Sequence, residues 1–324
     1  MLTTAPAAAA SLAAMPRPGR VAAAGAAAAG AAAAAIAWRA LWQEPRSDRV
    51  RERDLALPGW PDELAGLRVA LLSDLHAGAP HVREKRIERL VAAVNAHRPD
   101  LVLLLGDYID PEVPFGDPVA PRTVAARLGA LRAPRGVVAV LGNHDWHNDG
   151  PGMRTALREA GIAVLENEAT DAGGLWIAGV EDLRYRRPDI RRALRDVPAG
   201  APVILLAHDP DLFPGVPAHV ALTVSGHLHG GQIGVPLLRR PFLPSRFGER
   251  YAAGHVVEDG RHLYVTRGVG TTGLPVRLLA PPEAIVLRLR SASSPPAGPR
   301  ARPRRDRAPS RAAGRPPSRA PGPR

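Results

Sequence analysis

Residues 101–110 read LVLLLGDYID: five apolar residues and a glycine, followed by Asp107 and Asp110 three positions apart. A short apolar run that ends at a turn signal predicts a strand buried on both faces, as in the parallel sheet of an α/β protein. In such sheets, ligands bind in the crevice beyond the carboxyl ends of the strands. Asp107 is therefore expected either at a helix N-cap or among metal-binding or catalytic residues.

Apolar runs alternate with amphipathic segments from residue 67 onward, which predicts a β/α order. We expect strands at residues 67–72, 101–105, 137–141, 175–180, 203–207 and 220–224. We expect helices at residues 83–97, 123–131, 153–160 and 188–196. The remaining chain, to about residue 290, alternates short apolar runs with glycine turns and predicts β-hairpins and a sheet edge.

The composition excludes several classes of site. The 324 residues include no cysteine, which excludes disulfides, thiolate metal sites and cysteine nucleophiles. The net charge is +12, but residues 291–324 contain nine arginines and one aspartate, so most of the excess charge lies there. The rest of the chain carries about +4, an ordinary charge for a soluble domain. The charge therefore does not favour nucleic acid as a partner.

Residues 1–50 are a low-complexity region with an uncharged, Ala-rich stretch at residues 21–38. As a helix, this stretch would just cross a bilayer core of about 30 Å. Three interpretations stay open: a single membrane anchor, a signal peptide with Arg17 and Arg20 before it and cleavage at 35–37, or a disordered extension. We favour membrane association or export. Arginines are more frequent after the stretch than before it, which by count would keep the domain on the cytoplasmic side of the membrane. Large domains can nevertheless cross the membrane regardless of charge.

Residues 51–290 are expected to form the α/β domain. Residues 291–324 are rich in Pro, Arg, Ser and Ala and lack apolar periodicity, which predicts a disordered tail. The arginines of this tail could contact nucleic acid or anionic lipid, and a solvated tail is the interpretation that we prefer.

Polar residues typical of metal sites follow five of the expected strands. They are Asp74 and His76; Asp107 and Asp110; Asn143, His144 and Asp145; His208; and His227 and His229. Each group alone could be an ordinary loop or capping feature. The two histidines of the sequence GHLHG, with glycine on both sides, are the hardest to explain by packing. We expect the five groups to meet in one site at the carboxyl ends of the strands.

The donor atoms of this set are carboxylate, imidazole and amide, without sulfur. This mixture suits Mn²⁺, Fe or Zn²⁺ and is too rich in nitrogen for a Ca²⁺ or Mg²⁺ site. One ion cannot bind so many ligands, whereas two ions about 3.5–4 Å apart that share one carboxylate can. Asp107 follows the middle strand and is the expected bridge.

Taken together, the motifs resemble those of the calcineurin-like metallophosphoesterase superfamily. They occur in the family's order: DLH at 74–76, GDYID at 106–110, GNHD at 142–145, a histidine at 208, and GHLHGGQ at 226–232. The resemblance covers about residues 67–289 and is closest to the bacterial branch whose members carry a membrane or export segment. It implies a four-layer αββα sandwich of two mixed β-sheets.

The resemblance also implies a role for each residue. Asp74, His76 and His229 would bind one metal ion, and Asn143, His208 and His227 the other, with Asp107 bridging both. His144 would donate a proton or contact phosphate, Asp145 would orient its ring, and Asp110 would lie behind the ligands. The implied reaction is hydrolysis of a phosphate ester, phosphodiester or pyrophosphate foremost, by a metal-bridging hydroxide with His144 as general acid. The substrate would be a small molecule, or linked to a lipid or to the cell envelope.

Two other functions remain as alternatives. A metal-bound scaffold or regulator without catalysis would lack motif positions, and none is missing. A binder of nucleic acid or anionic lipid would act through the arginine-rich tail. Among the remaining residues, Trp146 and His147 could line a substrate groove or be ordinary loop residues, and Arg267 and Arg277 are expected in surface salt bridges.

Overall fold

The computed structural model describes residues 18–110, 112–235 and 239–292. Its helices are α1 (Pro18–Trp38), α2 (Glu84–Ala96), α3 (Pro121–Leu128), α4 (Asn143–Glu159) and α5 (Ile190–Ala193). A π-helical turn, η1 (Arg39–Gln43), follows α1, and 3₁₀ turns are η2 (Asp62–Leu64), η3 (Pro210–Gly215), η4 (His229–Gly231), η5 (Arg240–Phe242) and η6 (Gly248–Tyr251). The predictions for residues 1–17 and for the tail beyond residue 292 lie outside the described residues.

The strands form two mixed sheets. The first contains, in spatial order, β1 (Val50–Leu57), β12 (Ala284–Ser291), β2 (Arg68–Leu72), β3 (Leu101–Leu104), β4 (Val137–Ala139) and β5 (Ala163–Val164). The second contains β10 (Gly254–Glu258), β11 (Arg261–Val265), β9 (Leu222–Ser225), β8 (Val203–Leu206), β7 (Trp176–Gly179) and β6 (Glu168–Asp171). β2 to β5 run parallel, as do β11, β9, β8 and β7, whereas β12, β10 and β6 pair antiparallel with a neighbour. The prediction of an α/β fold with two mixed sheets is confirmed.

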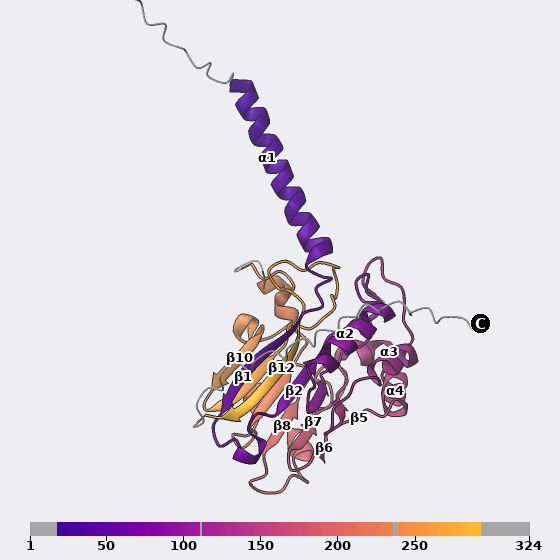
Figure 1. The fold of residues 1–324 in the computed structure, drawn as a ribbon, viewed down its shortest axis with the longest axis vertical. Helices are drawn as coiled ribbons and strands as arrows, with labels where there is room; N and C mark the ends of the chain where they lie inside the picture. The colour runs from indigo at the N-terminus through magenta and orange to yellow at the C-terminus, as the bar shows by residue number, and fades with distance from the viewer. Residues whose placement is uncertain (1–17, 111, 236–238, 293–324) are drawn as a thin grey trace, which may run out of the picture. The chain divides into compact units, whose positions relative to one another are not determined.

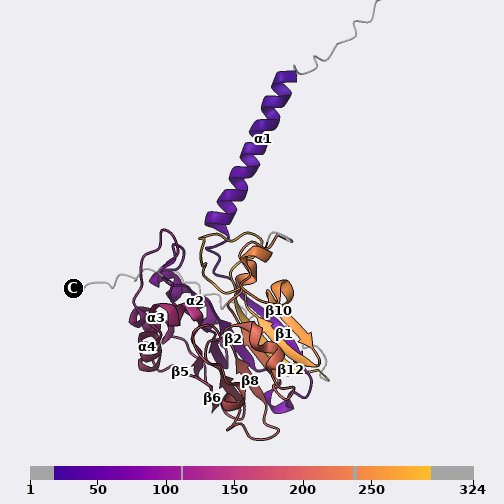
Figure 2. The ribbon, with the colours of Figure 1, turned by 180° about the vertical axis from the view of Figure 1, so that it is seen from behind.

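Three apolar cores separate the layers. Successive residues of a strand point to opposite faces, and in β3 Leu103 belongs to the core between the two sheets while Leu104 belongs to the core beneath α2, α3 and α4. This explains why residues 101–105 are apolar without alternation. Both views show these three helices together on one side of the first sheet (Figures 1 and 2). On the outer face of the second sheet, α5, η3 and η6 contribute Ala193, Phe213 and Tyr251 to the third core.

Three features differ from the sequence-based expectation. β1, β5 and β6 were not predicted, and β1 pairs in parallel with β12 along the edge of the first sheet. The helix expected at 153–160 begins ten residues earlier, at Asn143, with a break at Asp149 where φ is −158° and ψ is 68°. β10 and β11 form the expected hairpin, but β12 leaves it and joins the other sheet.

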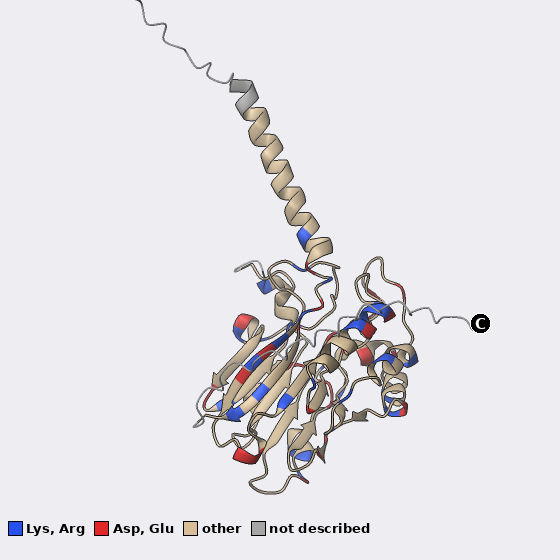
Figure 3. Ribbon diagram, viewed as in Figure 1, with Lys and Arg blue, Asp and Glu red and all other residues tan. Residues whose placement is uncertain are grey.

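The N-terminal segment is helical rather than irregular. Among the described residues one stretch, Ala22–Gln43, is long and apolar enough to cross a membrane, with 22 residues, a mean hydropathy of 1.3 and no buried positions. Residues 22–38 of α1 contain no charged side chain, as Figure 3 shows. Immediately after it the chain contacts the domain: Ala40 O accepts a hydrogen bond from Arg277 N at 2.9 Å, and Glu44 Oε1 accepts one from Ala280 N at 2.7 Å.

Candidate metal centre

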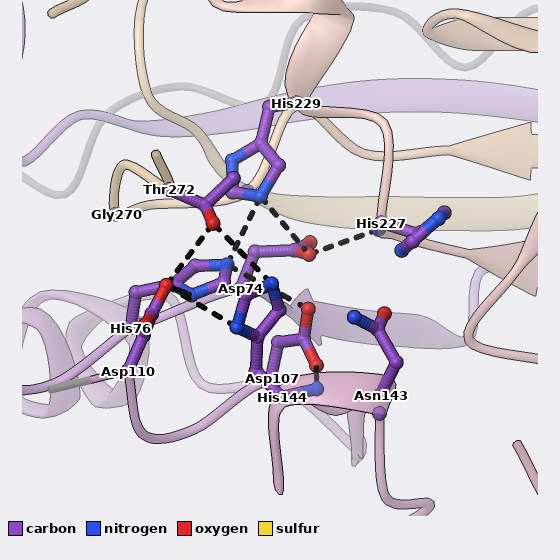
Figure 4. A network of polar contacts seen from close by, with 12 residues as sticks. Asp74, His76, Asp107, Asp110, Asn143, His144, His227, His229, Gly270 and Thr272 are labelled. Carbon is purple, nitrogen blue, oxygen red and sulfur yellow. Dashed lines mark hydrogen bonds and ion pairs between the residues drawn. The ribbon is translucent and has the colours of Figure 1, made fainter. Parts of the chain in front are cut away.

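The polar residues that follow five strands converge, as expected from the sequence. Asp74 and His76 follow β2, Asp107 and Asp110 follow β3, Asn143 and His144 follow β4, His208 follows β8, and His227 and His229 follow β9. The two sheets face each other, so that loops from both contribute to the same pocket. Figure 4 shows most of these side chains pointing toward one another.

Short distances connect the members of the site. His76 Nε2 lies 3.0 Å from His229 Nε2, which in turn lies 3.5 Å from Asp74 Oδ1. Asp107 Oδ2 lies 3.1 Å from His208 Nε2 and 3.6 Å from His76 Nε2. The amide oxygen of Asn143 lies 3.2 Å from His208 Nε2.

The backbone at the site is strained. Five of the predicted ligands have positive φ angles: Asp74 (53°), His76 (46°), Asp107 (56°), His227 (69°) and His229 (51°). Residues other than glycine rarely adopt this left-handed conformation, and when they do it is often at functional sites. Space is also limited, because a Cβ atom on Gly142 would overlap Asp107 Oδ1 and the ring of His208. The turns therefore fix the direction of the side chains at a cost in local stability.

Three groups of potential metal-binding side chains overlap in this pocket. They are Asp74, His76 and His229; His76, Asp107 and His144; and Asp107, His208 and His227. Within each group, one donor atom from every residue lies within 4.8 Å of the others. Asp74 Oδ2 is buried and has no hydrogen-bond partner among the residues that the structure describes. Buried carboxylate, imidazole and amide donors without sulfur fit Mn, Fe or Zn.

Burial and the neighbouring charges set the protonation of the site. Burial opposes ionisation of Asp107, but the adjacent His208 outweighs it and holds the pKa of Asp107 well below its usual range. Burial opposes protonation of His208, but Asp107 outweighs this effect and raises the pKa of His208 well above its usual value. Burial lowers the pKa of His227 and His229 well below the usual value, and nearby imidazoles add to this. Neutral imidazoles and ionised carboxylates are the forms that bind cations, so His227, His229 and Asp107 are in that form, whereas His208 would lose its proton to a bound ion.

Comparison with known proteins gives a consistent result. The model of the calcineurin-like phosphoesterase family matches residues 67–231. The chain belongs to this family. It is 32% identical over 259 residues to the "Uncharacterized metallophosphoesterase YkuE" of Bacillus subtilis (strain 168), covering 78% of this chain and 89% of that protein. An "Uncharacterized metallophosphoesterase" of Aquifex aeolicus (strain VF5) is 33% identical, covering 69% and 85%. A "Transmembrane protein with metallophosphoesterase domain" of Danio rerio is 31% identical, covering 75% and 58%.

Members of this family are metal-dependent hydrolases of phosphoric esters, and His144 of this phosphoesterase lies at the edge of the candidate metal centre. Its Nδ1 lies 3.3 Å from Asp110 Oδ2, and its Nε2 lies 3.3 Å from Thr272 Oγ1. Burial opposes protonation of His144, but Asp110 outweighs it and raises the pKa of His144 to about 9. Asp110 also lies 3.0 Å from His76 Nδ1, so one carboxylate contacts two imidazoles of the site.

The expected partner of His144 was Asp145, and the structure corrects this. Asp145 accepts hydrogen bonds from the backbone N–H groups of Asp107 at 2.8 Å, Tyr108 at 2.7 Å and Gly142 at 2.9 Å. It occupies the third position of α4, where a carboxylate turns back to cap the first turn of the helix. Asp145 therefore holds two ligand-bearing loops together, and Asp110 is the carboxylate that faces His144.

Three residues of the phosphoesterase site were missed or misplaced by sequence reasoning. Arg277, expected in a surface salt bridge, is fully buried, and its Nη2 lies 3.0 Å from His229 Nδ1. Thr272 donates to Asp110 Oδ2 at 3.0 Å. Gln232 exchanges two hydrogen bonds with the backbone of Thr272, at 2.7 and 3.0 Å. For these three residues the sequence offers one signal of a role in the site, which is that Gln232 ends the GHLHGGQ motif.

A cavity of about 380 Å³ opens onto the site of the phosphoesterase. Asp107, Asn143, His144, His227 and His229 form its polar wall. Trp146 and His147 do not line it. His147 instead lies 3.0 Å from both Glu112 and Tyr185.

Proposed function

We propose that the chain hydrolyses phosphate esters, with phosphodiesters or pyrophosphates as the preferred class, using two divalent cations. The central observation is the position of Asp107, which belongs to two of the three overlapping ligand groups, one with His76 and one with His208 and His227. A carboxylate shared by two groups is what a two-metal site requires.

Seven residues would hold the two ions: Asp74, His76, Asp107, Asn143, His208, His227 and His229. Mn, Fe and Zn all suit these donors. When bound, the two cations would neutralise the charge of the substrate phosphate and make a water molecule acidic enough to attack at neutral pH. The burial of the ligands supports strong binding, since Asp74 and His76 are 0% exposed.

His144 is the residue that we assign to proton transfer. It lines the cavity, its side chain keeps 24% of its surface exposed, and it can therefore reach the substrate. Asp110 lies behind the ring and favours the protonated form, which is the form that can protonate a leaving alcohol oxygen. Thr272 fixes the position of both groups by contacting Asp110 and His144 together.

The test uses the full chain, freed of metal with a chelator and reloaded separately with Mn²⁺, Fe²⁺ or Zn²⁺. Bis(nitrophenyl) phosphate and nitrophenyl phosphate are the substrates, and the diester is expected to be the better one. Asp107→Asn should abolish turnover and the increase in melting temperature on metal addition. Asp259→Asn is the matched control, because the Asp259 side chain is 87% exposed in a turn. Wild-type turnover by Asp107→Asn would refute the proposal.

We also propose that α1 attaches the phosphoesterase to a membrane. Its exposed surface, the length of the Ala22–Gln43 stretch and the name of the Danio rerio relative support this. Cell fractionation followed by N-terminal sequencing separates an anchor from a cleaved signal. An anchor predicts an intact α1 in the membrane fraction, whereas cleavage at residues 35–37 predicts a shorter chain that begins close to Trp38.

A further inference from the structure

One wall of the cavity is apolar. Besides the ligands, the cavity is lined by Ile233, Pro241, Phe242, Leu274 and Val276, which we call the apolar wall. Phe242 is 41% exposed and Leu274 is 51% exposed, so both side chains remain available to a ligand. A phosphate ester without an apolar group would leave this surface uncovered. The apolar wall therefore indicates a substrate that carries a hydrocarbon part next to its phosphate.

The apolar wall is connected to the end of the membrane-length helix. Leu274 and Val276 belong to the loop at residues 272–280, which also carries Thr272 at the catalytic end of the cavity (Figure 4). The same loop binds the chain just after α1, through the hydrogen bonds from Arg277 N to Ala40 O and from Ala280 N to Glu44 Oε1. A single loop thus contacts the catalytic groups on one side and the helix end on the other.

The exposed large apolar side chains concentrate on these same segments. Of the ten among the described residues, four lie at the helix end and three on or beside the apolar wall: Ile36, Trp38, Leu41, Trp42, Phe242, Leu274 and Leu279. Trp38 and Trp42 stack with ring centroids 5.6 Å apart, and the guanidinium of Arg46 lies over the Trp42 ring. Tryptophan and arginine at the end of an apolar helix are typical of the membrane–water interface.

We infer that the substrate is a phosphoester of a membrane lipid, whose phosphate reaches Asp107 and His144 while its hydrocarbon chain lies along the apolar wall. This inference rests on the proposed function. In the reaction a water oxygen forms a new bond to phosphorus, the bond from phosphorus to the leaving oxygen breaks, and that oxygen departs with a proton from His144. Anchoring by α1 holds the cavity where such a lipid resides, so the substrate does not have to leave the bilayer completely.

The test compares two diesters that differ only in their alkyl group: nitrophenyl methyl phosphate and nitrophenyl dodecyl phosphate. Both release nitrophenolate, and both are assayed with the metal-loaded full chain in dioleoylphosphatidylcholine vesicles. We expect the dodecyl ester to have the higher kcat/KM by about tenfold or more, as covering an apolar side chain would give. Because both esters are measured on one preparation, their ratio does not depend on the folded fraction.

Variants separate the apolar wall from simple enrichment of the dodecyl ester in the vesicles. Leu274→Asp and Phe242→Asp should each lower the dodecyl-to-methyl ratio by about tenfold. Val257→Asp should leave it unchanged, because Val257 is 53% exposed on β10 and does not line the cavity. A ratio that is unaltered in both wall variants, or that falls equally in Val257→Asp, would overturn the inference and leave the proposed function intact. No turnover of either ester by the wild type would instead overturn the proposed function, and the inference with it.

Discussion

Nη2 of Arg277 lies 3.0 Å from Nδ1 of His229, and both side chains are almost completely buried. The same guanidinium donates to the backbone oxygens of Gly270 at 2.6 Å, Arg267 at 2.8 Å and Ala280 at 3.0 Å. Arg277 therefore holds the loop at residues 272–280 and one candidate metal ligand in a fixed arrangement.

Arg277→Lys is expected to weaken metal binding. A lysine ammonium has three donors on a flexible stem and cannot replace the planar fork of arginine. Loss of a partner that orients a metal ligand typically lowers metal affinity by about 10–100-fold. Titration of the metal-free protein with Mn²⁺, followed by calorimetry, measures this directly.

The matched control is Arg267→Lys. The Arg267 side chain is one third exposed and pairs with Glu283 at 3.1 Å, and no described contact joins it to His229. Its Mn²⁺ affinity should equal that of the wild type. If Arg277→Lys also binds Mn²⁺ as tightly as the wild type, Arg277 has no role in positioning His229.

Asp110→Asn should reduce turnover with little loss of fold. The substitution removes the charge that faces His144 and His76, and an asparagine keeps the shape of the side chain. Because general acid catalysis contributes about 10²–10⁴-fold, we expect kcat to fall by at least about 10²-fold. Steady-state kinetics with a phosphodiester whose leaving group is an alcohol checks the rate, because nitrophenolate leaves readily without a proton, and a melting curve checks the fold. An unchanged kcat would exclude Asp110 as the group that positions His144.

Asp145→Asn should lower the stability of the fold more than it lowers turnover, the reverse of Asp110→Asn. Its two carboxylate oxygens accept backbone hydrogen bonds from Asp107, Tyr108 and Gly142, whereas the amide nitrogen of asparagine cannot accept any. Leaving buried N–H groups without an acceptor costs about 1–3 kcal/mol each, so we expect the free energy of unfolding to fall by at least about 2 kcal/mol. Urea unfolding measures it, with Asp259→Asn as the control. A wild-type unfolding midpoint in Asp145→Asn would contradict this capping role.

The sequence predicts the centre of the site better than its surroundings. Each ligand group follows a short apolar run, so the strand and the residue at its end are identified together. Arg277 and Thr272 belong instead to a long loop without apolar periodicity, and nothing local indicates that an arginine there is buried. Asp145 adjoins His144 in the sequence, whereas Asp110 belongs to another loop. Only the fold shows that Asp145 caps α4 and that Asp110 faces His144.

β1 shows the same limit for the fold. Its sequence, VRERDLAL, carries four charged residues because the strand lies at the edge of the first sheet, and it lacks the apolar run that marks the central strands. Edge strands are often charged, which prevents pairing with other chains. The motifs begin near residue 67, whereas the domain expected from the sequence begins at residue 51 and the sheet uses residues 50–57.

This difference leads to the last prediction, which concerns the boundary of the folding unit. β1 pairs with β12 along its whole length, from Val50 opposite Ala284 to Leu57 opposite Ser291. Leu55, Leu57 and Trp60 also lie in the core between the two sheets. A chain that starts at residue 67 would expose the edge of β12 and lose these side chains, each of which contributes about 1.5–3 kcal/mol by burial. We therefore expect it to aggregate or to unfold at much lower urea concentration than a chain that starts at residue 39.

Point substitutions in the full chain separate the contribution of the core from that of the pairing. Leu57→Ala should lower the free energy of unfolding by about 2–5 kcal/mol, because Leu57 is fully buried. Val257→Ala, at an exposed position of the other sheet, should change it by less than about 0.5 kcal/mol. Equal urea midpoints for the chains that start at residues 39 and 67 would show that β1 is dispensable. If the chain that starts at residue 67 is stable while Leu57→Ala destabilises the full chain, the core must rearrange when β1 is removed.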